Sequence, residues 1–255
     1  EHEVQGPQIQ LHKDSGLAVI RDQVQGKDIH FVGNATALGL APLYAHGHLD
    51  ALSFTLSVNG QEFLVDPGTY LYHSGGKWRE YFRSTRAHNT IRLNKQELSA
   101  QTGDFMYGRP YRITENTLKV KNGQVVWQAG HDAYLKKSPF AHVYREVVWD
   151  RDGASFAITD TIKSRQKVFV ELFFHCHPEC VVSSAAGKSV IQRGDTKLEL
   201  VFDQTLTSDI LQGSYDPMAG WYSPRFNEIH SCPTIRLYGS LADEARLRTR
   251  IVVQA

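Results

Sequence analysis

Hydrophobic and polar positions alternate along this chain in short runs, and turn-forming residues separate the runs. Because successive side chains of a strand point to opposite faces, this period of two is typical of β-strands with one buried side. No stretch keeps a helical period over three turns. The pattern predicts strands that include Leu17–Arg21, Ser53–Val58, Phe63–Val65, Thr90–Leu93, Leu118–Lys121, Val125–Gln128, Val143–Trp149, Ser155–Ile162, Lys167–Phe174, Ser189–Gln192, Lys197–Phe202 and Arg246–Val253.

Turn signals connect many of these runs. Asparagine or aspartate followed by glycine supplies the positive φ angles that tight hairpin turns need, so these dipeptides predict hairpins. The signals are Asn59-Gly60, Asn122-Gly123 and Asp152-Gly153, with a further turn at Gly75-Gly76.

The clearest hairpin spans residues 53–66. A two-residue turn at Asn59-Gly60 would bring largely apolar pairs onto one face and leave an acidic residue at the open end. The expected pairs are Val58 with Gln61, Leu56 with Phe63, Phe54 with Val65, and Ser53 with Asp66.

The fold class that follows is all-β: one large antiparallel β-sandwich that forms a single domain over residues 1–255. Hydrophobic residues make up 41% and charged residues 22%, which is ordinary for a globular domain. The net charge of +1 indicates neither a nucleic-acid partner nor a membrane surface, and no run of about 18 apolar residues predicts a membrane helix.

Three cysteines are too few for a disulfide framework. We expect Cys176, Cys180 and Cys232 to be free buried thiols, although one disulfide is possible. The chain begins at Glu1 without a charged and apolar leader, so we expect any secretion signal to lie outside this sequence.

The candidate chemistry concentrates between residues 46 and 89. His46-Gly47-His48, Asp66 and His88 provide imidazole and carboxylate ligands, and two imidazoles with one carboxylate are a common zinc set. Two alternatives stay open at this point. The histidines could only satisfy hydrogen bonds in loops or the core, or His46, His48 and Asp50 could form the H-x-H-x-D cluster of metallo-β-lactamase-like hydrolases, which needs helices that this pattern lacks.

These residues stand in a longer stretch that resembles the heparinase II/III-like polysaccharide lyases. Order, spacing and residue types agree over residues 46–90, and more loosely afterwards at His142–Glu146 and Asp150–Gly153. The matching segments are His46-Gly47-His48-Leu49-Asp50-Ala51-Leu52-Ser53-Phe54, Asn59-Gly60, Phe63-Leu64-Val65-Asp66-Pro67-Gly68-Thr69-Tyr70 and Trp78–Thr90.

The resemblance implies a carboxy-terminal β-sandwich that works with an amino-terminal (α/α) toroid, absent from this sequence, to cleave uronic-acid glycans by β-elimination. It implies one zinc ion on His48, Asp66 and His88, a catalytic role for His46, and a substrate-facing tyrosine at Tyr81. The expected substrate is heparin, heparan sulfate or an alginate-type polymer, and the expected location is periplasmic or secreted. Without the toroid, we expect the chain alone to be inactive.

A basic cluster accompanies these positions. Lys77–Lys95 contains six cations and a single acid, Glu80. Arginine binds anionic groups in a bidentate manner and aromatic rings stack on sugars, so we expect five substrate contacts here. These are Arg79, Arg83, Arg86, Trp78 and Tyr81, while an outward strand position is enough to explain Arg92.

Two further hypotheses complete the sequence analysis. His175-Cys176-His177 and Cys180 could bind a metal, but alternate residues of a strand cannot all converge on one ion, so we favour packing roles. For the whole chain, the alternative to a lyase module is a non-catalytic glycan-binding or structural β-sandwich.

Overall fold

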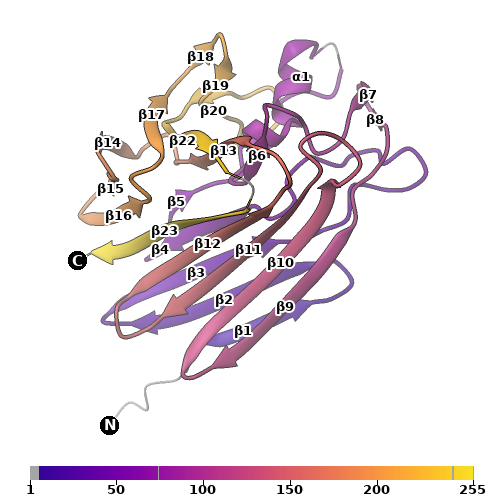
Figure 1. The fold of residues 1–255 in the computed structure, drawn as a ribbon. Helices are drawn as coiled ribbons and strands as arrows, with labels where there is room; N and C mark the ends of the chain where they lie inside the picture. The colour runs from indigo at the N-terminus through magenta and orange to yellow at the C-terminus, as the bar shows by residue number, and fades with distance from the viewer. Residues whose placement is uncertain (1–5, 74, 243, 255) are drawn as a thin grey trace.

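Two large antiparallel sheets face each other in the computed structural model, which describes residues 6–73, 75–242 and 244–254 (Figure 1). The smaller of the two has five strands in the order β1-β2-β3-β4-β5. Each strand pairs with the next one along the chain, so this sheet is a simple meander. Its strands are β1 (Gln8–His12), β2 (Leu17–Val24), β3 (Lys27–Asn34), β4 (Phe54–Val58) and β5 (Gln61–Leu64).

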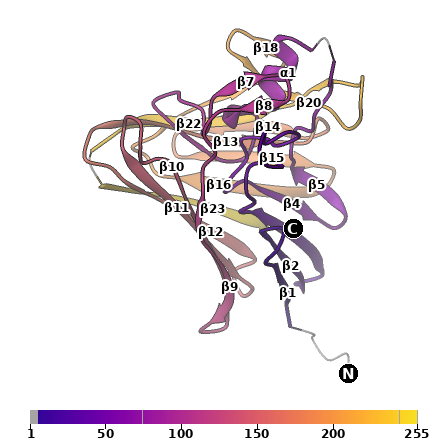
Figure 2. The same cartoon turned by 90° about the vertical axis from the view of Figure 1, so that its right-hand side faces the viewer.

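The larger sheet has eight strands in the order β14-β15-β16-β23-β12-β11-β10-β9. It lies in front of the five-stranded sheet in Figure 1, and Figure 2 shows the two sheets from the side. Its strands are β9 (Ile113–Lys121), β10 (Gln124–Tyr134), β11 (Ala141–Asp150), β12 (Ser155–Lys163), β14 (Val181–Ala185), β15 (Lys188–Arg193), β16 (Thr196–Phe202) and β23 (Glu244–Gln254).

A third sheet of four strands, β17-β22-β13-β6, extends the five-stranded one. The chain leaving β5 joins them, because Leu64 forms a bridge with Cys176 and the Val65 amide donates to the His175 carbonyl at 2.9 Å. The strands of this sheet are β6 (Ile91–Leu93), β13 (Val168–His175), β17 (Thr207–Leu211) and β22 (Thr234–Leu241).

Short elements cover the end of the sandwich near β6. Two helices, α1 (Lys77–Phe82) and η1 (Thr85–Ala87), lie there with three two-stranded ribbons (Figure 1). The ribbons are β7 (Gln101–Gly103) with β8 (Met106–Tyr107), β18 (Ser214–Tyr215) with β19 (Met218–Ala219), and β20 (Trp221–Tyr222) with β21 (His230–Ser231). No helix among the described residues is long and apolar enough to cross a membrane.

One continuous hydrophobic core fills the space between the sheets. Its centre is aromatic: the Phe31 ring stacks on Phe54 at 5.4 Å and on Phe156 at 5.2 Å, and Trp127 meets its edge at 5.9 Å. Strand β11 shows the alternation that builds such a core, since its buried and half-buried residues alternate without a break from Ala141 to Asp150. The prediction of an all-β sandwich is confirmed.

Every predicted strand overlaps an observed one, and the hairpin turns at Asn59-Gly60 and Asn122-Gly123 have the expected positive φ angles. The third hairpin forms with a longer loop, because Asp150 pairs with Ser155 and the positive φ falls on Ala154. Gly76 lies in a turn directly before α1.

The predicted register of the hairpin at residues 53–66 is wrong beyond its first pair. Val58 pairs with Gln61 as expected, but a bulge at Phe63 places Leu56 opposite Leu64. The bulge lets residues 63–65 leave the five-stranded sheet and pair with the end of β13. Ser53 therefore does not face Asp66, and its carbonyl accepts the Asn34 amide instead.

The three cysteines are free and buried, as expected. Burial raises the pKa of the Cys180 thiol to about 11 and that of the Cys232 thiol to about 12, so neither forms a thiolate near neutral pH.

Candidate metal centre

Three side chains from distant parts of the sequence meet where the five-stranded and four-stranded sheets join. His48 precedes β4, Asp66 follows β5, and His88 follows η1. One potential ligand atom from each lies within 4.8 Å of the other two, the one such group found among the described residues. The predicted set of His48, Asp66 and His88 is thus brought together by the fold.

The electrostatics of the group depend on one short contact. His88 Nδ1 donates to Asp66 Oδ2 at 2.7 Å. Burial lowers the pKa of His88, but the carboxylate of Asp66 more than compensates and the pKa is raised overall. Desolvation raises the pKa of Asp66, but the charge and hydrogen bond of His88 have a larger, opposite effect. The pKa of Asp66 is therefore lowered to about 2.

His48 has the opposite character. Burial, and then the charge of His88, lower the pKa of His48 to about 3, so its imidazole is neutral and free to offer a lone pair. The His88 Nε2 atom is buried without a hydrogen-bond partner among the described residues. A neutral imidazole, a carboxylate and a second imidazole with an unsatisfied nitrogen fit a zinc ion that keeps one open position.

The segment that carries His88 is held by its neighbours. The Asn89 amide donates to the carbonyls of Phe54 (2.8 Å) and Val65 (3.0 Å), and its oxygen accepts the His175 amide at 2.6 Å. Thr90 Oγ1 donates to the Ala51 carbonyl at 2.6 Å. These bonds tie the His88 segment to β4, to the residue before Asp66 and to the end of β13.

A buried ion pair in the opposite sheet also supports the group. Arg145 of β11 pairs with Asp160 of β12 at 2.7 Å, and both side chains are 1% exposed. Arg145 Nη1 then donates across the core to the carbonyls of Leu52 (2.7 Å) and Asn89 (2.8 Å). This pair could have been predicted from the sequence, because Arg145 and Asp160 each interrupt the otherwise apolar face of their strand.

His46 stands apart from the three ligands. It is exposed, its φ is +62°, and its Nδ1 lies 3.4 Å from the Tyr72 hydroxyl. A positive φ strains a non-glycine residue, so the surrounding loop must hold this conformation. Gly47 contributes to that loop, because a β-carbon there would lie 2.7 Å from the Gly39 amide nitrogen.

Tyr72 is the functional candidate that the sequence analysis missed. Its ring stacks on Phe105 at 5.9 Å and contacts Phe226 at 5.0 Å, so an aromatic wall flanks His46. The position lies between Tyr70 and the Gly75-Gly76 turn, where no spacing rule distinguishes one tyrosine from another.

Comparison with known proteins identifies the family of this chain. The family described as heparinase II/III-like, C-terminal, matches residues 4–250. The chain belongs to this family. No curated protein sequence matches the chain.

Solved lyases share the fold of this heparinase II/III-like domain. Heparan sulfate lyase HepC from Pedobacter heparinus, solved as a mutant, superposes with a TM-score of 0.76 at 16% identity and covers 96% of this chain. A heparinase III superposes with a TM-score of 0.74 at 14% identity over 98% of this chain. The domain spans only 36% and 37% of those two chains.

The same architecture occurs outside lyases. The 4-alpha-glucanotransferase from Thermococcus litoralis superposes on the heparinase II/III-like domain with a TM-score of 0.55 at 11% identity. At such identity the likeness concerns the fold alone.

Arg79 and Arg83 of the heparinase II/III-like domain are predicted from the sequence to contact substrate. They are only 1% and 2% exposed, which contradicts that prediction. Arg83 donates to the Tyr107 hydroxyl and to the carbonyls of Gly103 and Met106, so its guanidinium is already engaged. Arg79 lies over the Tyr72 ring at 4.8 Å and over Phe105 at 5.4 Å. Arg79 therefore lies beneath the aromatic wall, and neither arginine faces solvent.

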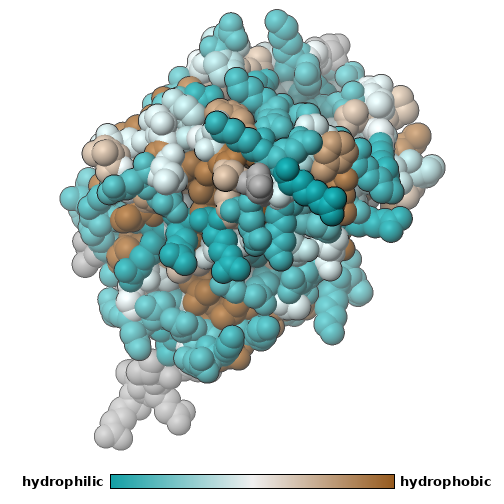
Figure 3. Space-filling view, in the orientation of Figure 1, coloured by the Kyte–Doolittle hydropathy of each residue, from teal (hydrophilic) through white to brown (hydrophobic). Residues whose placement is uncertain are grey.

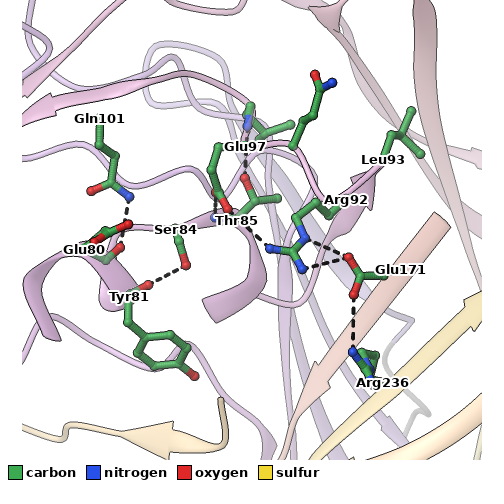
Figure 4. Close-up of polar contacts among 12 residues, drawn as sticks. Glu80, Tyr81, Ser84, Thr85, Arg92, Leu93, Glu97, Gln101, Glu171 and Arg236 are labelled. Carbon is green, nitrogen blue, oxygen red and sulfur yellow. Dashed lines mark hydrogen bonds and ion pairs between the residues drawn. The ribbon is translucent and has the colours of Figure 1, made fainter. Parts of the chain in front are cut away.

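Tyr81 is also buried, in a small cluster with Phe82, Ala87 and Met218, and this contradicts its expected contact with substrate. Burial raises its pKa to a value above the range in which tyrosines act as bases near neutral pH. Figure 4 shows the surrounding polar contacts, in which Ser84 Oγ donates to the Tyr81 carbonyl at 2.7 Å. The tyrosine beside His46 is Tyr72 instead.

The remaining members of the basic and aromatic cluster are partly covered. Trp78 packs edge-on against Trp221 at 5.0 Å, and the Arg86 guanidinium lies 5.8 Å from the Tyr81 ring centroid. Arg92 does not take the outward strand position that we expected. It is 8% exposed and pairs with Glu171 at 2.8 Å and Glu97 at 3.4 Å (Figure 4).

The competing metal sites are not formed. His46 and Asp50 are outside the ligand group, and the described residues contain two short helices, so the H-x-H-x-D alternative has neither its cluster nor its helices. Desolvation raises the pKa of Asp50 to about 6. His175 is buried beside Asn89, and Cys176 and Cys180 lie in the core, as their predicted packing roles require.

Proposed function

We propose that this domain is the carboxy-terminal part of a polysaccharide lyase that cleaves uronic-acid glycans of the heparan sulfate or alginate type by β-elimination. The observation that carries the proposal is the gathering of His48, Asp66 and His88 beside an exposed His46 and Tyr72. A helical toroid elsewhere in the same protein would form the other wall of the cleft. In keeping with such substrates, we propose a periplasmic or secreted location.

The residues of the domain have distinct roles in this proposal. His48, Asp66 and His88 would hold one zinc ion, which supplies positive charge and fixes the loops around it. β-Elimination removes the proton at C5 of the uronate and protonates the leaving oxygen at C4. Such transfers need a titratable side chain within hydrogen-bond reach, and His46 is the exposed candidate here.

Buried positive charge favours an acidic substrate. Arg79 Nη1 and Nη2 are buried without hydrogen-bond partners among the described residues, and Arg79 and Arg83 lie close enough to lower the pKa of His48. Arg79 Nε donates to the Asp104 carbonyl at 3.1 Å, and the remaining positive charge beneath the aromatic wall raises the local potential where the uronate carboxylate would bind. Arg79 would thus assist carboxylate neutralisation without contact.

The test of the lyase is the absorbance of its unsaturated product. Full-length protein is assayed on heparan sulfate, alginate and hyaluronan, with the isolated domain as a control that we expect to be inactive. His46→Ala should reduce turnover while leaving the metal content intact. An absence of unsaturated product on all three polymers would favour the alternative, a non-catalytic glycan-binding or structural module. The exposed His46 argues against that alternative, because a binding module has no need of a histidine at this position.

The zinc proposal is tested by elemental analysis. His48→Ala and Asp66→Ala should each abolish stoichiometric zinc, whereas the exposed control variants His12→Ala and Asp152→Ala should retain it. Zinc retained by both ligand variants would refute the assignment.

A further inference from the structure

The outer face of the eight-stranded sheet carries a trough along β12. The outward residues in the middle of this strand are small, namely Ala157, Thr159 and Thr161, and the residues between them are buried; the larger Lys163 ends the row. Figure 3 looks onto this face, where hydrophilic side chains predominate around small hydrophobic patches. A row of small side chains between two rows of large ones leaves a groove parallel to the strands.

The two walls differ in chemistry. The register places Tyr144, Glu146 and Val148 of β11 on one side of the trough. On the other side it places Arg246, Arg248 and Arg250 of β23, opposite Thr161, Thr159 and Ala157. All three arginines are exposed while Leu247 and Thr249 between them are buried, so the arginine side chains form a row on this face.

Two adjoining cavities lie along this trough, with volumes of about 460 and 830 Å³. They share Glu146 and Thr159, which makes them one continuous depression. Tyr144 lines the first, with its ring against Gly130, where a β-carbon would come within 2.6 Å of the ring. Val148 and Ala157 line the second and add an apolar floor.

The charges on the arginine wall are not neutralised by neighbouring side chains. Among the described residues, Arg246 and Arg248 make no ion pair, and Arg250 bonds only the neutral Ser155 hydroxyl, at 3.1 Å. The acids that line the cavities are Glu115, Glu146 and Asp203, and Glu146 already accepts the Gln128 amide at 2.7 Å. The three arginines repel one another because they carry like charges in a row. An anionic ligand along β23 would reduce this repulsion.

We propose that this trough is a second, non-catalytic binding site for an acidic oligosaccharide, whose carboxylate or sulfate groups contact Arg246, Arg248 and Arg250 and whose sugar faces contact Tyr144 and Val148. None of the three metal ligands lines either cavity, so the site is separate from the candidate metal centre. The choice of ligand class rests on the proposed function. The site would hold a polymer on the enzyme between cleavage events.

The test is calorimetric titration of the domain with heparan sulfate oligosaccharides, with neutral cello-oligosaccharides as the ligand control. All proteins carry His48→Ala, which removes binding that depends on the metal centre. The groove variant combines Arg246→Ser, Arg248→Ser and Arg250→Ser. The matched control removes three exposed cations elsewhere, through Lys13→Ser, Arg21→Ser and Arg165→Ser. A shape variant, Thr159→Trp, fills the trough without changing charge.

We expect the groove and shape variants to bind at least about tenfold more weakly than the parent, with the charge control unchanged. Equal binding by parent and groove variant, or no binding by the parent, would overturn the proposal. Tighter binding of a single-stranded DNA, or a dimer that the groove substitutions dissociate, would assign the trough to another partner and also overturn it. If the full-length protein shows no lyase activity but the trough still binds the oligosaccharide, only the proposed function is refuted.

Discussion

The contact between His88 and Asp66 would set the chemistry of the proposed metal centre. Without a metal, the His88 imidazole donates to the Asp66 carboxylate, and the pair raises the pKa of the histidine. Zinc needs both imidazoles deprotonated, so protons compete with the metal at His88 and hardly at all at His48, whose pKa is lowered to about 3.

The sign of the pH dependence follows. The stabilising contribution of His88 is complete below its ordinary pKa of 6.5 and is lost as the pH rises through its raised folded value. The stabilising contribution of neutral His48 is complete above pH 6.5 and is lost as the pH falls toward its folded pKa of about 3. Above the folded pKa of His88, zinc can replace the lost proton.

We therefore predict that zinc stabilises the domain more at about pH 8 than at about pH 6. Zinc at a hundred times its Kd would contribute about 2.7 kcal/mol to the free energy of unfolding. Melting curves with zinc and with a chelator at both pH values measure the difference. The His48→Ala variant is the control and should show no zinc effect. A shift that is larger at the acidic pH would contradict the assignment of His88.

Tyr72 leads to a second prediction at this scale. Its hydroxyl is 3.4 Å from His46 Nδ1 and its ring is held between Phe105 and Phe226, so it orients the imidazole. If the full-length protein is the proposed lyase, Tyr72→Phe should lower its kcat about tenfold, the loss of roughly 1.4 kcal/mol, with little change in KM. Tyr70→Phe is the matched control. An unchanged kcat in Tyr72→Phe would show that Tyr72 does not orient His46 for turnover.

At the scale of elements, the site depends on strands that contribute no ligand to it. Arg145 and Asp160 lie on β11 and β12, yet Arg145 holds the carbonyls of Leu52 and Asn89 on the other side of the core. Removing one partner of a buried pair leaves an unpaired charge, which typically costs about 3–5 kcal/mol.

Asp160→Asn should therefore lower the free energy of unfolding by about 3–5 kcal/mol and weaken zinc binding in the folded protein. Urea denaturation and zinc titration measure the two effects. Glu199→Gln, which breaks the surface pair with Lys188, is the comparison and should cost at most about 1 kcal/mol. Equal costs for the two substitutions would show that the buried pair does not support the loops.

At the scale of the whole molecule, one hydrophobic core joins the five-, eight- and four-stranded sheets. Phe156 lies at its centre, stacked on Phe31 and 4.5 Å from the Trp149 ring. A shared core predicts a single cooperative unfolding transition, since no sheet can lose its packing alone.

Phe156→Ala should then reduce the free energy of unfolding by about 3–5 kcal/mol and shift every probe together. Far-UV circular dichroism and tryptophan fluorescence, followed through one denaturant series, provide two such probes. The exposed Phe140 provides a control, because Phe140→Ala should leave the midpoint nearly unchanged. Separate transitions in the two signals would mean that the sheets unfold independently.

Much of this molecule can be predicted from local pattern. The alternation of apolar and polar residues locates the strands, and Asn59-Gly60 and Asn122-Gly123 determine their turns by backbone sterics. Strands such as β3 and β22 escape prediction because a charged residue or a glycine interrupts their alternation. The composition of the chain likewise predicts three buried, free cysteines.

The sequence by itself determined the fold class, the hairpins and the residue types of the metal group, because these depend on neighbours along the chain or on a recognisable spacing. Only the tertiary structure decided that a bulge at Phe63 carries the strand into a second sheet, that Tyr72 and not Tyr81 lies beside His46, and that Arg79 and Arg83 are buried. Those outcomes depend on contacts between segments that are far apart in sequence. No local pattern records such contacts.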